Sequence, residues 1–538
     1  MDRNAIITSL LRDPDKEKII WDIVIIGGGA TGLGCAVDAA SRGFKALLLE
    51  QHDFAKGTSS RSTKLVHGGV RYLRQGNISL VLEALKERGL LIQNAPHLVT
   101  NQTFVVPNYH WWEKPYYGIG LKMYDWLAGK RGFGNSRWLS RKQTLKHLPT
   151  LEPRNLKGGV LYHDGQFDDS RLAINLMQTV FDHGGTALNY TRVSGFIHEG
   201  ERVSGVKAED QETGEKFDVK AKVIINATGV FTDSVRRMNN PDTEPIIQVS
   251  QGVHIMLDKK FHPGKSAIMI PKTEDGRVLF AVPWHNKVLI GTTDTPVPNA
   301  SLEPRATEKE IEFLLSHCAK YLAHDPVASD VKSIFTGLRP LVVEEKGKKS
   351  TKSISRDHTL IVDPSGLVTI TGGKWTTYRK MGQETIDQAI KIGNLSERKS
   401  ITENLNIHGW TSDPNEEDPY RMYGSDAESI KKLSGGKNGS ARFHPDLACG
   451  AGEVRWAVRN EMARTVEDVL SRRTRSILLN ARESMEIAPR VARIMAEELG
   501  YSKTWQIHQV NEYQKLAQGY LLDESWNSFH SPESDNSN

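Results

Sequence analysis

A sixteen-residue stretch at positions 58–73, TSSRSTKLVHGGVRYL, concentrates side chains that can bind a phosphate-bearing ligand. Hydroxyl groups come first, a lysine and a histidine follow, and an Arg-Tyr pair comes after two adjacent glycines. Glycine lets a backbone pass close to a ligand, and guanidinium groups bind phosphate oxygens in a bidentate manner. The stretch therefore indicates a binding loop, and the elements around it decide which ligand it serves.

The residues before this loop predict a strand, a glycine turn, a helix and a second strand. Residues 22–26 form a short β-branched apolar run that is typical of a strand buried on both faces. Residues 32–41 predict the helix, with Gly43 placed to end it, and residues 46–49 predict the second strand. This order is that of a nucleotide-binding unit.

Three glycines of this unit fill the G-x-G-x-x-G pattern. Gly27 suits a tight turn, Gly29 lets the backbone approach a pyrophosphate, and Gly32 allows the helix to pack on the strand. The helix N-terminus offers N–H groups and a positive dipole end to the phosphates. Glu50, 18 residues beyond the last glycine, can accept hydrogen bonds from ribose hydroxyls and would repel a 2′-phosphate. Glycine-rich turns are common, but strand, spacing, helix and acid coincide here, which favours dinucleotide binding.

The strand pattern changes downstream and later returns, which predicts a discontinuous cofactor-binding domain. KVIINATGVFTDSV at 222–235 and GLVTITGGKWTTYRK at 366–380 both run from an apolar strand into a glycine turn. Strand-like pieces between them favour an inserted sheet-based substrate domain, and helical periodicity follows beyond about residue 400. We therefore expect a cofactor-binding domain at 21–100, 155–235 and 330–395, a substrate domain at 101–154 and 236–329, a helical domain at 396–525 and a disordered tail at 526–538.

The 538-residue chain has 38% hydrophobic and 25% charged residues, the composition of a globular protein with two or three domains. Its three scattered cysteines have neither the count of a disulfide framework nor the spacing of a zinc site, so we expect no metal. A net charge of +5 with interspersed charges gives no reason to expect a nucleic-acid partner. Neither a secretory signal nor an apolar run of about 20 residues is found, so we expect a cytosolic protein or one that touches a membrane from one side.

The segment 111–148 is rich in aromatic and basic residues. It could be an amphipathic segment that contacts a membrane, with aromatic side chains at the interface and basic ones toward lipid head groups. The favoured interpretation is that it forms the core and rim of the second domain.

The order of several motifs resembles that of the FAD-dependent glycerol-3-phosphate dehydrogenases. These motifs are the opening segment through Tyr72, INATG, GTTDT, TGLRPL, SISRDHTL and TGGKWTTYRK, and they span nearly the whole chain. The resemblance implies an α/β fold: a FAD-binding Rossmann-like domain of the glutathione-reductase/D-amino-acid-oxidase type, with an inserted α+β substrate domain and a C-terminal helical domain. It implies oxidation of sn-glycerol 3-phosphate to dihydroxyacetone phosphate by hydride transfer to FAD. A quinone would accept the electrons, and the enzyme would associate peripherally with the inner, cytoplasmic face of the cell membrane.

The resemblance also assigns residues to the site. The ADP half of FAD would contact Gly27, Gly29, Gly32 and Glu50, and the rest of FAD would contact Thr58, Ser59, Ser60, Lys64, His67, Val193, Gly229, Asp294 and Gly373. The substrate pocket would be built from Arg71, Tyr72, His254, Arg339, Arg356 and Lys374.

The phosphate of glycerol 3-phosphate would need several cationic side chains in its pocket, because a phosphomonoester carries roughly two negative charges at neutral pH. The flanks of Arg339 predict a partly buried turn, where an unpaired charge is costly and a ligand partner is favoured. Arg356 stands beside Asp357 and could instead form a salt bridge with it, and Tyr72 could be a core residue.

The catalytic residues are expected among His254, Arg339 and Lys374. A neutral histidine can take the substrate proton near pH 7, and sequence alone leaves this role open between His67 and His254, either of which could be structural. Arg339 could stabilise a developing alkoxide, and Lys374 could lie near the flavin rather than on the substrate.

Competing functions share parts of the pattern. A glycerol-3-phosphate oxidase would pass the electrons to oxygen, and a flavin-dependent amine or amino-acid oxidase would need fewer cations for a carboxylate. A non-catalytic dinucleotide-binding protein would leave the hydroxyl run and the second glycine turn unexplained. The oligomeric state is left open, a homodimer included.

Overall fold

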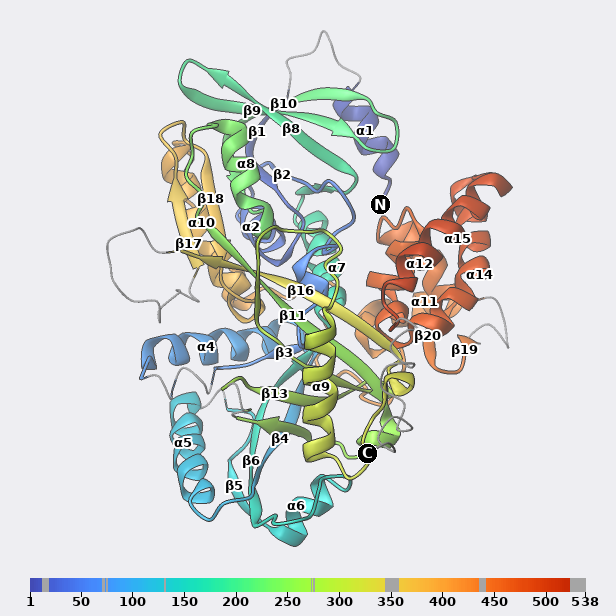
Figure 1. The fold of residues 1–538 in the computed structure, drawn as a ribbon. Coiled ribbons are helices and arrows are strands. Elements are labelled where there is room, and N and C mark those ends of the chain that lie inside the picture. Colours follow the sequence, from blue (N-terminus) through green and yellow to red (C-terminus); the bar gives the residue numbers. More distant parts are fainter. Residues whose placement is uncertain are drawn as a thin grey trace.

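The computed structural model describes residues 1–11, 19–69, 73, 76–129, 132–271, 273, 276–343, 358–434 and 442–522. Of the expected site residues, Arg71, Tyr72 and Arg356 lie outside these ranges, as does the expected tail at 526–538. The described residues form two large sheets and a group of helices near the C-terminus (Figure 1).

The first sheet contains the glycine-turn unit predicted from the sequence. Its strands are, in spatial order, β17 (His358–Val362), β18 (Val368–Gly372), β10 (Lys216–Asn226), β1 (Ile20–Ile26), β2 (Ala46–Leu49) and β7 (Thr186–Leu188), with β9 (Arg202–Asp210) beside β10 and β8 (Thr191–Glu199) beside β9. The strands from β18 to β7 run parallel. In β1, Ile23 and Ile25 pack toward the helices and Val24 and Ile26 pack toward the β8–β9 hairpin, which confirms a strand buried on both faces.

Helices α2 (Ala30–Ser41), α7 (Asp169–Asp182) and α10 (Tyr378–Ile392) cover one face of this sheet. Helix α2 begins two residues before the expected start and ends at Ser41 as expected. It crosses α10 closely, because a Cβ on Gly382 would lie only 2.5 Å from the Gly34 carbonyl oxygen. Helices α1 (Arg3–Leu11) and α8 (Thr232–Asn239) lie on the opposite face with the hairpin.

The second sheet is larger and mainly antiparallel. Its strands are, in spatial order, β15 (Thr295–Val297), β11 (Ile247–Asp258), β14 (Lys287–Gly291), β13 (Leu279–Trp284), β12 (Ala267–Ile270), β4 (Val99–Asn108), β6 (Gly158–Phe167) and β3 (Leu65–Val66), with β16 (Ser333–Val342) beside β11 and β5 (Arg137–Ser140) beside β6. Our expected boundaries assigned the segments of β6 and β16 to the cofactor-binding domain. Long antiparallel ladders with β4 and β11 place both strands in the second sheet instead.

Alternation along β11 gives the second sheet two different faces. Val253, Ile255 and Leu257 pack against α9 (Glu308–Tyr321). His254 and Met256 therefore point to the other face. Helices α4 (Ile78–Asn94), α5 (Glu113–Ala128) and α6 (Arg141–His147) lie around the β4–β6 end of the sheet (Figure 1).

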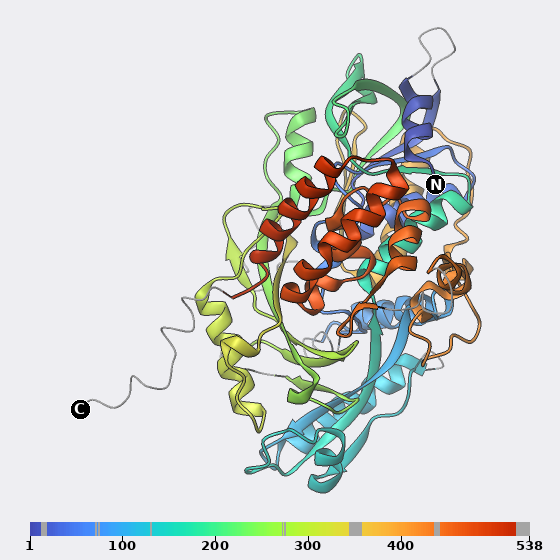
Figure 2. The same ribbon diagram turned by 90° about the vertical axis from the view of Figure 1, so that its right-hand side faces the viewer.

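The C-terminal helices pack beside both sheets (Figure 2). They are α11 (Ala427–Leu433), α12 (Ala451–Asn460), α13 (Ser476–Leu479), α14 (Ala481–Leu499) and α15 (Lys503–Gln518), with a short hairpin of β19 (Arg442–His444) and β20 (Leu447–Gly450). Val454 and Val491 share one hydrophobic core with Phe104 and Met256 of the second sheet.

A buried ion cluster joins the helical domain to the first sheet. The π-helical turn Asp468–Arg473 places Arg472 2.5 Å from the Asp53 carboxylate, and Arg473 pairs with the same carboxylate. Asp53 lies three residues after Glu50, so the helical domain holds the chain that leaves the second strand of the glycine-turn unit.

Candidate active site

A cavity of about 660 Å³ lies between the two sheets. It is lined by the ends of β1, β2, β10 and β18, by the loop at 57–63 and by the His254 face of the second sheet. Open parallel sheets bind ligands outside the carboxyl ends of their strands. The expected site residues that line the cavity are Gly27, Gly29, Glu50, Thr58, Ser59, His67, Val193, Gly229, His254, Asp294, Arg339, Gly373 and Lys374.

The glycine turn after β1 has the geometry that a dinucleotide requires. Gly27 has φ of +109°, and a Cβ on it would lie 2.7 Å from the Ala227 carbonyl oxygen. A Cβ on Gly32 would lie 1.9 Å from the Gly27 carbonyl oxygen, although Gly32 itself stands behind the cavity wall. Helix α2 thus begins at the cavity, and its first N–H groups and dipole can receive a pyrophosphate.

Glu50 stands at the end of β2, where a ribose would need an acceptor. Its two carboxylate oxygens accept hydrogen bonds from the backbone N–H groups of Gly28 (2.6 Å) and His52 (2.8 Å). Burial raises the pKa of Glu50, and these two hydrogen bonds partly offset that rise. The carboxylate is oriented by the backbone, and its remaining lone pairs suit hydroxyl donors.

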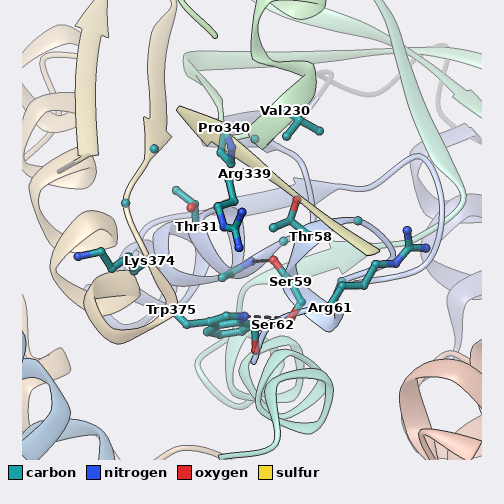
Figure 3. Close-up of a pocket in the computed structure, with 18 of the residues that line it drawn as sticks. Thr31, Thr58, Ser59, Arg61, Ser62, Val230, Arg339, Pro340, Lys374 and Trp375 are labelled. Carbon is teal, nitrogen blue, oxygen red and sulfur yellow. Dashed lines mark hydrogen bonds between the residues drawn. The ribbon is translucent and has the colours of Figure 1, made fainter. Parts of the chain in front are cut away.

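The loop at 57–63 is pinned between the two sheets. The Thr58 hydroxyl donates to the Leu338 carbonyl of β16 at 2.6 Å, and the Ser59 hydroxyl accepts from the Ala30 N–H at 2.9 Å. The Trp375 indole donates to the Ser59 carbonyl at 2.9 Å (Figure 3). The loop therefore connects the start of α2 with the glycine turn after β18, as a ligand with two parts would require.

Two other residues expected along the cofactor, Ser60 and Lys64, do not line the cavity. The Lys64 ammonium is fully buried and lies 2.7 and 2.8 Å from the Asp169 carboxylate oxygens of α7. It also donates to the Ser60 carbonyl at 2.7 Å. A buried charge needs such a partner because desolvation is costly. The structure thus corrects the expected place of both residues: they anchor the loop to α7.

His254 and Arg339 project from the same sheet face. In the β11–β16 register His254 stands opposite Phe335, Gly252 opposite Gly337, and Ser250 opposite Arg339. The two glycines leave the space between the two functional side chains open to other groups. The Arg339 guanidinium extends over Gly252, where a Cβ would lie 2.3 Å from Nη2.

Arg339 is held by protein acceptors before any substrate arrives. Its guanidinium donates to the Thr292 hydroxyl (3.2 Å) and the Thr293 carbonyl (3.1 Å) and pairs with Asp294 at 3.2 Å. Arg339 lies within β16 rather than in the expected turn. Asp294 orients this arginine and also accepts from Ser250, and its expected place near the flavin stays a prediction.

The environment of His254 keeps its imidazole neutral. Burial holds the pKa of His254 well below its ordinary value, and the positive charges of Arg339 and Lys64 lower it further. A neutral imidazole near pH 7 can accept a proton. The second histidine candidate, His67, also lines the cavity, and its backbone N–H donates to the Thr376 hydroxyl at 3.3 Å.

Lys374 and the glycine turn at Gly373 form another wall of the cavity. The Lys374 side chain points away from the Arg339 guanidinium (Figure 3). Gly373 has φ of +72°, and a Cβ on it would lie 2.4 Å from the Met381 sulfur, so this turn also requires glycine.

Sequence reasoning missed several residues that line the cavity. Arg61, Ser62 and Thr63 belong to the hydroxyl-rich stretch itself. Their membership of that stretch was a signal from which they could have been predicted. A second set forms an apolar floor on neighbouring strands: Phe104, Tyr162, Met269 and Phe280. Nothing in their separate apolar strands distinguishes them from ordinary core residues.

Comparison with known proteins agrees with this architecture. Residues 22–379 match the family described as FAD dependent oxidoreductase, and residues 368–506 match the C-terminal domain of alpha-glycerophosphate oxidase. The mitochondrial glycerol-3-phosphate dehydrogenase of Mus musculus is 39% identical over 537 residues, which cover 93% of this chain and 73% of that protein. The mitochondrial glycerol-3-phosphate dehydrogenase of Arabidopsis thaliana is 37% identical, with coverage of 96% and 88%.

A solved structure extends the likeness to the whole fold. The glycerol-3-phosphate dehydrogenase from Bacillus halodurans, complexed with FAD, has a TM-score of 0.78 and 29% identity, covering 96% of this chain and 97% of that chain. The glycine turns, Glu50 and the α2 N-terminus described above fit that cofactor. The chain therefore belongs to the FAD-dependent oxidoreductase family and, within it, to the glycerol-3-phosphate dehydrogenases, with FAD as its cofactor.

Proposed function

We propose that the chain oxidises sn-glycerol 3-phosphate at its C2 hydroxyl to dihydroxyacetone phosphate. The observation that carries this proposal is the common sheet face that presents neutral His254 and cationic Arg339 to the cavity of the dinucleotide cradle. FAD, when bound, takes up the hydride from the substrate carbon.

Each protein group has a defined part in this proposal. His254 accepts the proton of the C2 hydroxyl, and Arg339 attracts the anionic substrate and stabilises charge on its oxygen. The Thr292 hydroxyl, the Thr293 carbonyl and the Asp294 carboxylate hold the Arg339 guanidinium in place, so little reorganisation is needed when the substrate binds. Lys374 and the positions Arg71, Tyr72 and Arg356, which lie outside the described residues, complete the proposed phosphate receptor.

We propose a quinone as the electron acceptor. The apolar floor of Phe104, Tyr162, Met269 and Phe280 supports this, because an aromatic and thioether surface suits a flat apolar ring better than a phosphate ester. Phe104 stacks on Tyr162 with ring centroids 5.1 Å apart, so the floor is continuous across two strands.

Anaerobic reduction tests both parts. The purified FAD-loaded protein is mixed with glycerol 3-phosphate, and the flavin absorbance is followed before a short-chain quinone or oxygen is added. We expect bleaching that the quinone reverses quickly and oxygen slowly. Fast reoxidation by oxygen with peroxide formation would replace the quinone with oxygen as acceptor, and the absence of bleaching would refute the substrate.

We further propose that the protein docks on a membrane surface through an aromatic face, formed by Trp111, Trp112, Tyr116, Ile119, Met123, Trp126 and Trp138. These side chains project from α5 and its neighbours into solvent, with 82% of Trp111 and 79% of Trp126 exposed. Within this segment Leu121, Tyr124 and Leu139 are core residues, whereas the aromatic face is exposed, as either the rim or a membrane-contacting surface would be.

Exposed basic side chains of α5, β5 and α6 favour an anionic bilayer as the partner. Lys122, Arg137, Arg141, Lys142 and Lys146 are all exposed. Aromatic rings at the interface and cations toward acidic head groups are the arrangement of a peripheral membrane anchor. Among the described residues, no helix is both long and apolar enough to cross a bilayer. The relatives from Mus musculus and Arabidopsis thaliana are named mitochondrial. The cytoplasmic face and the homodimer stay predictions for this chain.

Vesicle sedimentation tests this docking. The double variant Trp111→Ala/Trp126→Ala should lose binding to anionic phosphatidylserine-containing vesicles by at least about 10-fold, because two large interfacial rings are removed. The matched control is Ile507→Ala, which removes an exposed apolar side chain from α15, a helix outside the aromatic face. Equal binding of the double variant and the wild type would refute the aromatic face as the anchor.

A further inference from the structure

Thr63 makes a hydrogen bond to the imidazole of His254. The Thr63 hydroxyl oxygen lies 2.9 Å from His254 Nε2, although the two residues are 191 positions apart. Thr63 follows the pinned part of the 57–63 loop and lines the cavity. The other ring nitrogen, Nδ1, is buried and has no hydrogen-bond partner within the described part of the chain. A single side-chain hydroxyl therefore contacts the polar edge of the proposed base.

Packing fixes the plane of this imidazole but leaves its protonation pattern undetermined. The ring stacks on Phe335 with centroids 5.0 Å apart and an interplanar angle of 12°. The His254 ring also packs against Gly291. A Cβ at Gly291 would lie 2.1 Å from His254 Cδ2, so the ring occupies the space that a side chain there would need. These contacts are apolar, so they do not distinguish a ring protonated at Nδ1 from one protonated at Nε2.

The charged groups around His254 oppose its protonation. Arg339 of β16 approaches with its partner Asp294, and Lys64 approaches from before β3 with its partner Asp169 of α7. In the observed contacts the Arg339 guanidinium donates to Thr292 and Thr293, and the Lys64 ammonium donates to Ser60 and Asp169. The neutral ring consequently has one N–H and one lone pair to place.

Two neutral forms satisfy the Thr63 contact. Either the Thr63 O–H donates to a lone pair on Nε2, or an Nε2–H donates to the Thr63 oxygen. Because Nδ1 is buried and Thr63 lines the cavity, Nε2 is the nitrogen on the cavity side. Only the first form leaves a lone pair there that can take a substrate proton.

We propose that Thr63 is a positioning residue for the base: its hydroxyl donates to His254 Nε2 and holds the neutral ring in the form protonated at Nδ1, with the proton-accepting nitrogen beside the cavity. When the alcohol binds, its hydroxyl proton moves to this same lone pair, and the Thr63 hydroxyl turns to another acceptor. This inference rests on the proposed function above, since it assigns a partner to the proposed base.

The experiment compares Thr63→Val, which keeps the shape and removes the hydroxyl, with Thr63→Ser, which keeps the hydroxyl. The limiting rate of flavin reduction by glycerol 3-phosphate and the substrate dissociation constant are measured from pH 5 to pH 9 in the FAD-loaded protein. We expect Thr63→Val to lower the limiting rate by about 10- to 100-fold, because an unheld base is misplaced. The substrate dissociation constant should change by less than about threefold, and Thr63→Ser should restore the rate.

The direction of the pH shift separates the two neutral forms. A donor to the lone pair stabilises the neutral ring, so its loss raises the pKa of His254 and moves the acid limb of the rate to higher pH. An acceptor of Nε2–H stabilises the protonated ring, so its loss would move the limb to lower pH. An upward shift supports the proposal. A downward shift, or a rate and limb that match the wild type, overturns it.

Two controls complete the design. Thr144→Val removes a buried hydroxyl on α6 that donates to the Ser140 carbonyl at 2.9 Å, away from the cavity, and should leave the reduction rate unchanged. In a His254→Gln background, Thr63→Val should change the rate by less than about twofold, whereas a full additive loss would place Thr63 outside the action of His254. Failure of the wild type to be reduced would refute the proposed function, whereas reduction that is equal in wild type and Thr63→Val refutes this inference alone.

Discussion

Replacing Gly291 with alanine tests whether the position of His254 limits the reaction. A Cβ at this position would lie 2.1 Å from His254 Cδ2 and 2.8 Å from Nε2. Carbon atoms pack at about 3.5–4.0 Å, so the ring must move by more than about 1 Å. A displacement of about 1 Å at a catalytic group can cost about 100-fold in rate, equivalent to about 2.7 kcal/mol. The added methyl group should also lower the free energy of unfolding by about 1–3 kcal/mol through overpacking.

The assay for Gly291→Ala is anaerobic flavin reduction by stopped flow, after the FAD-to-protein ratio and the melting temperature have been measured. Gly195→Ala is the matched control, because a Cβ on that strand glycine would meet only the Lys207 side chain, at 3.7 Å. A folded, FAD-loaded Gly291→Ala protein whose reduction rate lies within about threefold of the wild type would refute the assignment of His254 as base.

Three other perturbations follow from the same structure. Gly252→Ala places a Cβ 2.3 Å from Arg339 Nη2 and should raise the KM for glycerol 3-phosphate by about 10- to 100-fold in steady-state kinetics; an unchanged KM would remove Arg339 from the phosphate receptor. Gly32→Ala places a Cβ 1.9 Å from the Gly27 carbonyl oxygen and should yield protein without bound FAD, visible as loss of the flavin absorbance, whereas a normal flavin content would contradict the tight turn. Burial lowers the pKa of His408, but hydrogen bonds to carboxylates of α7 and of the helical domain raise it to about 9. The stability that His408 contributes is thus present below about pH 6.5 and is lost as the pH rises through 9. In urea titrations, the difference in unfolding free energy between wild type and His408→Gln should therefore shrink from pH 7 to pH 10. A constant difference would rule out this ion pairing.

The nucleotide-binding part of the site could be predicted because its constraints are local. The glycine turn needs a positive φ at Gly27 and a close approach of Gly32 to the Gly27 carbonyl oxygen, and both requirements arise within the turn itself. The position of Glu50 can be predicted because it depends only on the length of the strand, helix and second strand that precede it. Local requirements of this kind are visible in a single sequence.

The substrate side of the site could be predicted only in part, because its contacts are long-range. The partner of Lys64 is 105 positions away and that of Thr63 is 191 positions away, and both pairings depend on how the two sheets are placed. The sheet membership of β16 depends on its register with β11, so the flanks of Arg339 indicated a turn where the structure has a strand. For the segment 111–148 the sequence left two interpretations open, and which of its aromatic residues are exposed depends on how α5 packs against the second sheet.

The pairing order of the first sheet has a consequence for how the chain is made. Strand β10 lies between β1 and β18, and β18 ends at Gly372, about 350 residues after β1. At a synthesis rate of about 5–20 residues per second, the opening glycine turn leaves the ribosome roughly 20–70 s before its sheet can be completed. The core shared by the second sheet and the C-terminal helices waits longer still. The edge of β10 is therefore exposed while the roughly 150 residues between the ends of β10 and β18 are made, and the apolar surface of the second sheet is exposed until the C-terminal helices follow. Chaperone capture during that interval is expected to govern the yield.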